Sequence, residues 1–316
     1  MDVVCTEIVV QKTWDEFIQQ HSPMALFQSW KWGDVEKKLG RKIWRWGWFT
    51  GDTLVGIAQI IKVPARRGTF LHVRHGPVGK IDYEDLKKLA KTERTWFIRI
   101  SPQVPPQEEH MYRNRGFVRA PIHAMDAEFC WVLDVDKSEE ELLRGMRKTT
   151  RYEIKHAAGT VTKSKDIDKF IYLYDETSKR HNFVEHMGIR EEFETLDCDL
   201  FLASNEKRLL AAAIIVYFGD QAIYHHGASV PNKVGASYLI QWKAIREAKK
   251  RGKKLYNFWG IAPQEKPNHP WRGITLFKTG FGGRQMAFMH AQDYPLSPLY
   301  VIPKTIESIR KRLKGY

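Results

Sequence analysis

The sequence has little cysteine, no long apolar run and no leader-like start, and each absence excludes a class of protein. Its three cysteines, Cys5, Cys130 and Cys198, are far apart and none belongs to a CxxC pair, which disfavours a disulfide framework and a zinc site. The longest apolar run, residues 209–218, is much shorter than the roughly 20 residues of a membrane-spanning helix. The first residues lack a basic segment followed by an apolar one, so a cleaved secretion signal is not expected. These absences predict a cytoplasmic protein.

Positive charge, by contrast, is in excess. The 316 residues include 51 Lys and Arg against 37 Asp and Glu, which gives a formal charge of +14. Hydrophobic residues, at 43%, supply enough apolar surface for folded cores, and the length predicts about two domains. The excess charge indicates an anionic partner, which is a nucleic acid, a phosphorylated metabolite or a membrane surface.

Hydrophobic periodicity predicts a mixed α/β chain in which one order of elements occurs twice. The first half is expected to contain a strand at 3–10, a helix opened by a capping box at 13–16, a helix at 30–39, a hairpin of strands at 43–49 and 54–63, a strand at 69–73, a helix at 83–90 and a strand at 95–100. The second half is expected to contain helices at 142–155, 166–181 and 190–196, strands at 200–203, 209–218 and 222–226, a helix at 236–251 and a strand at 254–258. The repeated order predicts two tandem domains, 1–135 and 136–291, with residues 292–316 packing back on the first.

Two basic helices carry much of the excess charge. One face of the helix predicted at 142–155 presents Arg144, Arg147, Lys148, Arg151 and Lys155. The long helix and the residues after it add Lys243, Arg246, Lys249, Lys250, Arg251, Lys253 and Lys254. A solvated helix face has the same pattern, but the two stretches together favour a polyanion as partner.

A small-residue turn, Asn232-Lys233-Val234-Gly235-Ala236-Ser237, precedes the long helix and is a candidate phosphate-binding turn. Acetyl-coenzyme A enzymes of the GNAT class have a Q/R-x-x-G-x-G/A loop at the equivalent junction. This turn lacks the leading Arg or Gln and the final Gly, so conventional coenzyme A binding is disfavoured while a GNAT-like fold stays plausible.

The C-terminal third carries an ordered series of motifs, at residues 225–229, 238–245, 249–252, 256–261 and 277–283, the last being Phe-Lys-Thr-Gly-Phe-Gly-Gly. The series closely resembles the Fem family of peptidoglycan bridge-forming aminoacyltransferases, and residues 27–35 and 146–154 resemble Fem segments as well. The resemblance spans nearly the whole chain. It implies an α/β fold of two tandem GNAT-like domains. It also implies an enzyme that moves an amino acid from tRNA to an amine of a precursor stem peptide, which is carried on a pyrophosphate.

The resemblance also implies roles for individual residues. Lys278 would stabilise the oxyanion of the transfer reaction, with Phe277 shaping the site. Substrate contacts are implied at Trp32, Lys37, Arg190, Tyr224 and His226, and tRNA contacts at Arg147, Lys148 and Arg151. Two positions depart from the family pattern. Glu36 stands where a phosphate-binding lysine is expected, and Ser101, which follows Arg99, stands where an acidic residue is expected.

Neither a metal ion nor a cofactor is expected. Neighbouring residues of a strand point to opposite faces, so His225 and His226 are not expected to bind one metal ion, and His290 is distant in sequence. The expected partners are aminoacyl-tRNA, as co-substrate, and a nucleotide-linked or lipid-linked peptidoglycan precursor, with peripheral contact to the inner membrane face and a monomeric protein. Two alternatives are an N-acyltransferase that uses acyl-coenzyme A and a non-catalytic RNA-binding module.

Overall fold

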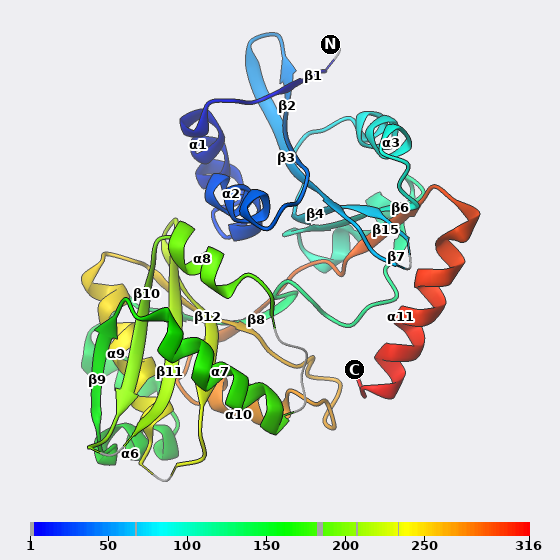
Figure 1. The fold of residues 1–316 in the computed structure, drawn as a ribbon. Helices are drawn as coiled ribbons and strands as arrows, with labels where there is room; N and C mark the ends of the chain where they lie inside the picture. Colours follow the sequence, from blue (N-terminus) through cyan, green and yellow to red (C-terminus); the bar gives the residue numbers. More distant parts are fainter. Residues whose placement is uncertain (1–2, 67, 182–185, 207, 233) are drawn as a thin grey trace. The chain divides into compact units, whose positions relative to one another are not determined.

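The computed structural model describes residues 3–66, 68–181, 186–206, 208–232 and 234–316. Within these residues the chain divides into two compact units, each built on one mixed β-sheet (Figure 1). The first unit comprises Met1–Phe129, Ala262–Pro270 and Ala287–Tyr316, and the second comprises Cys130–Ile261 and Trp271–Met286.

The first unit contains β1 (Val4–Glu7), α1 (Gln11–His21), η1 (Leu26–Gln28), α2 (Trp30–Lys38), β2 (Ile43–Thr50), β3 (Thr53–Val63), β4 (Phe70–His75), β5 (Val78–Gly79), α3 (Tyr83–Thr92), β6 (Phe97–Pro102), η2 (Pro106–Glu108), α4 (Glu109–Arg113), β7 (Val118–Arg119), β15 (Gln292–Pro295), η3 (Pro298–Tyr300) and α11 (Val301–Leu313). Its strands follow the order β1-β2-β3-β4-β6-β15-β7, with β5 beside β3. The C-terminal segment joins this sheet because β15 pairs with both β6 and β7. The core is formed by alternate strand residues such as Ile60, Val73 and Ile98 against Leu86 of α3.

The second unit contains β8 (Phe129–Asp134), α5 (Glu139–Gly145), α6 (Lys148–His156), β9 (Thr160–Ser164), α7 (Ile167–His181), α8 (Ile189–Thr195), β10 (Cys198–Ser204), β11 (Leu209–Phe218), β12 (Gln221–Ser229), α9 (Ala236–Lys250), β13 (Leu255–Gly260), α10 (Arg272–Thr279) and β14 (Arg284–Ala287). Its strands follow the order β14-β8-β13-β12-β11-β10-β9. Helices α7 and α9 cover opposite faces of the sheet (Figure 1). Apolar residues of α9, among them Ile240, Ala244 and Ile245, pack against Phe201, Ala213 and Ile215 of the strands.

The two units repeat one arrangement. In the first, the antiparallel meander β2-β3-β4 is followed by α3 and by β6, which pairs with β4 in parallel. In the second, the meander β10-β11-β12 is followed by α9 and by β13, which pairs with β12 in parallel. The predicted α/β class with two tandem domains is therefore confirmed.

Two local predictions need correction. The first stretch of the first unit ends at Phe129, where β8 begins, and not at residue 135, because β8 pairs with β13 in the second sheet. Residues 262–270 and 287–291, which were predicted in the second domain, belong to the first unit. Helix α1 begins at Gln11 without a side-chain cap, so the capping box predicted at residues 13–16 is wrong. A capping box does form at Ser138, whose side chain and that of Glu141 bond each other's backbone N–H at the start of α5.

The basic helix predicted at residues 142–155 is two helices, α5 and α6. Met146 and Arg147 between them have extended backbone angles. The break is fixed by Arg147, whose N–H donates to the carbonyl of Gly280 at 2.8 Å. This long-range hydrogen bond takes the place of the bond that the Arg147 N–H would make within a continuous helix. The basic residues therefore do not form one continuous stripe.

In the part of the chain that the structure describes, every helix is too short or too polar to cross a membrane.

Candidate active site

Lys278 is a buried lysine of α10 whose ammonium group contacts a backbone carbonyl. Its Nζ lies 2.6 Å from the carbonyl oxygen of Gly260, at the end of β13, and 5.9 Å from the centre of the Tyr224 ring. Only 5% of the residue is exposed. Burial lowers the pKa of the Lys278 ammonium group to about 7. Lys278 therefore places a titratable positive charge in a low-dielectric site, where developing negative charge is strongly stabilised.

A distortion of β13 lies beside Lys278. The register between β13 and β8 shifts between Asn257 and Gly260, and Trp259 has a φ of 67°, in the left-handed region that few non-glycine residues adopt. The side chain of Asn257 holds this turn by accepting a hydrogen bond from the N–H of Trp259 at 2.8 Å. Bulges of this kind re-aim the end of a strand. No sequence pattern predicts it.

Aromatic rings pack around Phe277, the residue before the lysine. The ring of Phe277 is half-buried and lies edge-on to Tyr238 and Phe281, at centroid distances of 5.0 and 5.4 Å. The hydroxyl of Tyr224 occupies the space of a missing side chain, since a Cβ on Gly227 would lie 1.8 Å from it. The predicted residues Lys278, Phe277 and Tyr224 are thus brought together in the second unit.

The Phe-Lys-Thr-Gly-Phe-Gly-Gly segment is fixed to β8 at its glycines. The indole N–H of Trp131 donates to the carbonyl of Gly282 at 2.6 Å. Gly283 has a φ of 100°, and a Cβ there would lie 2.1 Å from the carbonyl oxygen of Val132. Only glycine fits this position, because both the backbone angle and the space exclude a side chain.

Gly283→Ala is expected to destabilise the second unit by about 3 kcal/mol, the upper end for a strained backbone position. The position of Lys278 should change with it, since the substitution moves the turn that holds this residue. Gly273→Ala in α10 is the matched control. Apart from its chain neighbours and its own helix backbone, no atom of the described residues would lie within 4 Å of a Cβ there, and alanine in a helix stabilises by about 0.5–1 kcal/mol. Equal urea midpoints for the two variants would contradict this account of the turn.

Glu192 of α8 is a buried carboxylate surrounded by imidazoles. Its Oε2 lies 3.1 Å from Nε2 of His225 and 2.6 Å from Nε2 of His226, and its Oε1 lies 2.6 Å from Nε2 of His186. Burial would raise the pKa of Glu192, but His225 and the hydrogen bonds from the three histidines outweigh it and hold this pKa well below its usual range. Glu192 was not predicted as a site residue, because the spacing of the sequence gives no sign of this contact.

The prediction that His225 and His226 point to opposite faces is wrong. In the pairing of β12 with β11, His226 lies opposite Ile214 and Tyr224 lies opposite Ile215. His225 is therefore an extra residue in a β-bulge, which breaks the alternation of side chains. Both imidazoles reach one oxygen of Glu192 as a result.

Of the predicted tRNA contacts, two are engaged inside the second unit. The guanidinium of Arg147 donates to the carbonyl of Leu276 at 3.1 Å and to Oγ1 of Thr279 at 3.2 Å. The guanidinium of Arg151 donates to the carbonyl of Met146. Lys148 is exposed. Arg147 and Arg151 thus hold the break between α5 and α6 against α10.

The other predicted residues of the second unit lie near its surface. Arg190, which is 44% exposed, forms an ion pair with Asp168 of α7. In the turn before α9, the side chain of Asn232 accepts hydrogen bonds from the N–H groups of Val234 and Ala236, at 3.3 and 3.4 Å. These donors are the ones that a bound phosphate would need. Lys233 of this predicted phosphate-binding turn lies outside the described residues.

In the first unit, Trp32 is buried and supports Glu36. The indole N–H of Trp32 donates to Oε1 of Glu36 at 3.0 Å, and Arg41 forms an ion pair with the same carboxylate. Trp32 is only 1% exposed and so offers almost no surface to a substrate in this structure. Lys37 is exposed. Glu36 is therefore a buried structural residue, and Lys37 is the accessible cation next to it.

The carboxylate expected at the position of Ser101 comes from another part of the chain. Ser101 Oγ donates to Oδ2 of Asp126 at 3.3 Å, and Arg74 donates to Oδ1 of Asp126 at 2.6 Å. Burial would raise the pKa of Asp126, but Arg74 and its neighbours hold this pKa well below the usual range. Asp126 was missed because it lies 25 residues beyond Ser101 in sequence.

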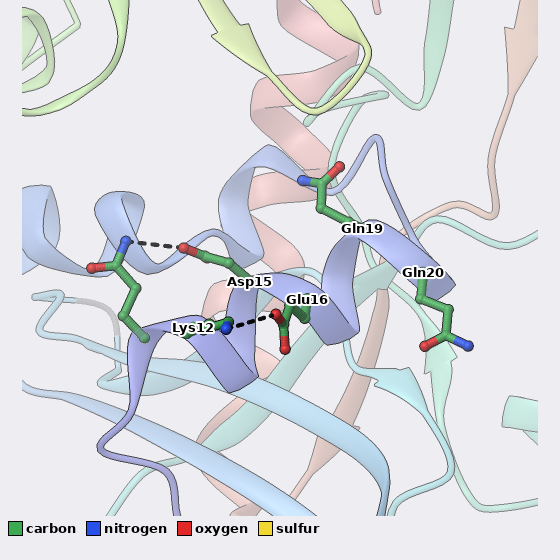
Figure 2. A pocket seen from close by; sticks show the side chains of 6 residues that line it. Lys12, Asp15, Glu16, Gln19 and Gln20 are labelled. Atoms are coloured by element: carbon green, nitrogen blue, oxygen red, sulfur yellow. Dashed lines mark hydrogen bonds and ion pairs between the residues drawn. The ribbon is translucent and has the colours of Figure 1, made fainter.

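Figure 2 shows a shallow hollow on α1 in the first unit. The polar side chains that line it all come from this one helix. Gln11 donates to Oδ2 of Asp15 at 2.9 Å, and Lys12 lies 3.8 Å from Glu16. Exposed pairs of this kind contribute little. Asp15 also accepts a hydrogen bond from the N–H of Trp30, the first residue of α2, at 3.4 Å. The hollow is therefore lined by polar side chains of one helix and is not proposed as a reactive site.

Together, the duplicated meander, helix and parallel strand define a protein with two tandem GNAT-like domains. Solved structures agree with this class. A crystal structure of FemX superposes with a TM-score of 0.78 at 18% identity, over 100% of both chains. A tandem GNAT protein from the clavulanic acid pathway gives a TM-score of 0.58 at 11% identity, over 94% of this chain and 99% of that one.

The chain belongs to the FemAB family, whose profile matches residues 9–120 and 191–308. It is 23% identical to the lipid II:glycine glycyltransferase of Staphylococcus aureus (strain COL), over 95% of this chain and 94% of that protein. It is 24% identical to the aminoacyltransferase FemA of Staphylococcus epidermidis, over 46% of this chain and 36% of that protein.

Proposed function

We propose that the chain is an aminoacyltransferase that moves an amino acid from its ester on tRNA to an amine of a peptidoglycan precursor stem peptide. The observation that carries the proposal is the buried ammonium group of Lys278, held at the Gly260 carbonyl by a glycine-rich turn. Membership of the FemAB family and the full-length similarity to a lipid II:glycine glycyltransferase support it.

The chemistry is aminolysis of an ester. The precursor amine, once deprotonated, attacks the carbonyl carbon, and a tetrahedral oxyanion forms. The new C–N bond remains, the C–O bond to the ribose breaks, and the ribose oxygen takes up a proton as the amine nitrogen loses one. The ammonium group of Lys278 is positioned to stabilise the oxyanion. The substrate amine is itself the nucleophile, so the reaction requires no nucleophilic side chain.

A transfer assay tests the proposal. Purified protein is incubated with a panel of charged tRNAs carrying labelled amino acids and with nucleotide-linked or lipid-linked precursor. Label is expected to appear on the precursor, and RNase treatment of the donor is expected to abolish it. An acetyl-coenzyme A arm tests the alternative donor. Transfer from acetyl-coenzyme A with none from any charged tRNA would overturn the proposal.

The tRNA would lie against the exposed lysines of α6, because the neighbouring arginines are engaged internally. Replacing Lys148 and Lys155 by glutamate is expected to weaken transfer and to lower the salt dependence of tRNA binding by about one unit of slope per lysine. Lys169→Glu with Lys179→Glu on α7 makes the same charge change in the same unit at exposed positions. An equal loss in both double variants would show that net charge, and not this face, binds the tRNA.

The precursor side of the proposal rests on the accessible cations Lys37 and Arg190. A pyrophosphate-linked precursor needs such groups for its charge. Since aminoacyl-tRNA is a cytoplasmic substrate, the reaction is proposed to occur in the cytoplasm, and a lipid-linked precursor would bring the protein to the inner membrane face.

A further inference from the structure

The imidazoles around Glu192 converge on one point. His186 comes from the segment before α8, Glu192 from α8 and His226 from β12, and each offers a nitrogen or oxygen atom within 4.8 Å of the other two. All the imidazoles present the same ring atom, Nε2, to the carboxylate. This is the donor set of a metal centre with two histidines, one carboxylate and open positions.

We propose that His186, Glu192 and His226 form a binding site for one divalent transition-metal ion, with Zn²⁺ as the metal they fit best. The site is proposed from these side chains alone and holds whether or not the protein transfers amino acids from tRNA.

Binding of an ion would require the side chains of the cluster to move. In a tetrahedral centre with bonds of about 2.0 Å, neighbouring ligand atoms lie about 3.3 Å apart. The Glu192 oxygens lie 2.6 Å from Nε2 of His186 and of His226. These two distances end on different oxygens of Glu192, and the three ligand atoms lie within 4.8 Å of one another, so the carboxylate and the imidazoles would have to move to reach ligand spacing.

The surroundings of the cluster fit a metal centre. Glu192 and His226 are 3% and 9% exposed, whereas His186 is 40% exposed, so an ion has access from the His186 side. The rings of Phe170 and Tyr174 lie 6.4 and 6.3 Å from that of His226 and form an apolar wall. An apolar shell with one open side excludes bulk water while leaving a coordination position free.

Two backbone features bring the ligands together. The bulge at His225 turns β12 so that His225 also contacts Glu192 and can orient its carboxylate, as outer-shell partners do. Gly188, with a φ of 98°, reverses the chain between His186 and Glu192. His225 links the cluster to β13, because its ring centroid lies 5.5 Å from that of Trp259, the residue before the Gly260 that Lys278 contacts.

Metal titration of the chelator-treated protein tests the site. Zn²⁺ is expected to bind at about one equivalent per chain, and Co²⁺ to give the visible absorption of a low-symmetry nitrogen and oxygen site. His226→Ala and Glu192→Gln should weaken binding at least about 100-fold, since loss of a ligand exceeds the 10–100-fold loss of an outer-shell partner. His156→Ala and Glu191→Gln are matched controls in the same unit and should leave binding unchanged.

His186→Ala keeps the test decisive if the buried variants do not fold, because His186 is exposed enough to be replaced without opening the core. Zn²⁺ should raise the melting temperature of the wild type by mass action and have no effect on His186→Ala. Wild-type protein that binds Zn²⁺ no better than His186→Ala, or that shows no change in melting temperature, would overturn the proposal.

Discussion

Replacing Lys278 by methionine is expected to lower the rate of transfer by about 10²–10³-fold, the effect of removing one group that stabilises an oxyanion. The methionine side chain fills a similar volume but carries no charge. The measurement is single-turnover transfer with saturating donor and precursor, so that the chemical step is observed. Lys179→Met, at an exposed position of α7, is the control and should retain the wild-type rate.

The same substitution is expected to make the folded protein more stable. The pKa of Lys278 is about 7 in the folded chain and about 10.4 when unfolded, so the unfolded state binds more protons between these values. The buried lysine therefore costs stability below pH 7, and this cost disappears as the pH rises toward 10.4. The free energy of unfolding of Lys278→Met should exceed that of the wild type by about 1–3 kcal/mol at pH 6 and by less at pH 9. A variant that is inactive because it is unfolded would instead have a lower free energy of unfolding than the wild type.

The dependence of rate on pH distinguishes two roles for Lys278. As an oxyanion stabiliser it must be protonated, so the single-turnover rate should fall as pH rises through about 7. As a general base it must be neutral, and the rate would rise instead. Lys278→Arg keeps its charge throughout this range, so it should retain partial activity and lose the falling limb. A falling limb unchanged in Lys278→Arg would exclude Lys278 as its source.

Periodicity predicted the elements that are long and locally consistent. The strand predicted at residues 209–218 has those bounds in the structure, and the hairpin of β2 and β3 departs from its predicted bounds by only one residue at either side of its turn. These segments carry their pattern within a dozen residues, and their neighbours in the sheet reinforce it. The repeated order of meander, helix and strand was visible for the same reason.

The features that build the candidate site have no such local sign. The break between α5 and α6 depends on a bond from Arg147 to Gly280, and the bulge at His225 depends on how β12 meets β11. Glu192 and Asp126 reach their partners from 34 and 25 residues away. Each arises from tertiary contacts that override the alternation or helical period of the segment. The resemblance to the Fem family supplied Lys278, which spacing alone would have left as an ordinary lysine.

The buried ion pair between Arg99 of β6 and Asp293 of β15 is expected to be the most sensitive point of the first unit. Two nearly parallel bonds, of 2.7 and 2.8 Å, join the side chains, which are 5% and 0% exposed. Asp293 also accepts from the hydroxyl of Tyr300 at 2.8 Å. Replacing Asp293 by leucine leaves the guanidinium buried with only the partial support of Glu307, so we expect a loss of about 3–5 kcal/mol.

A double-mutant cycle separates the cost of an unpaired charge from the value of the pair. Arg99→Met alone should cost about as much as Asp293→Leu, whereas the two together should recover much of the loss, because neither charge then remains buried without its partner. Urea unfolding is followed by hydrogen exchange of the backbone amides of β6 and β15, which reports the stability of the first unit separately from that of the second. Glu16→Gln removes an exposed pair and should change its stability by less than about 1 kcal/mol. Additive losses in the double variant would mean that the two side chains have no coupling energy, so that other contacts of each residue, and not the pair, hold the C-terminal segment to the sheet.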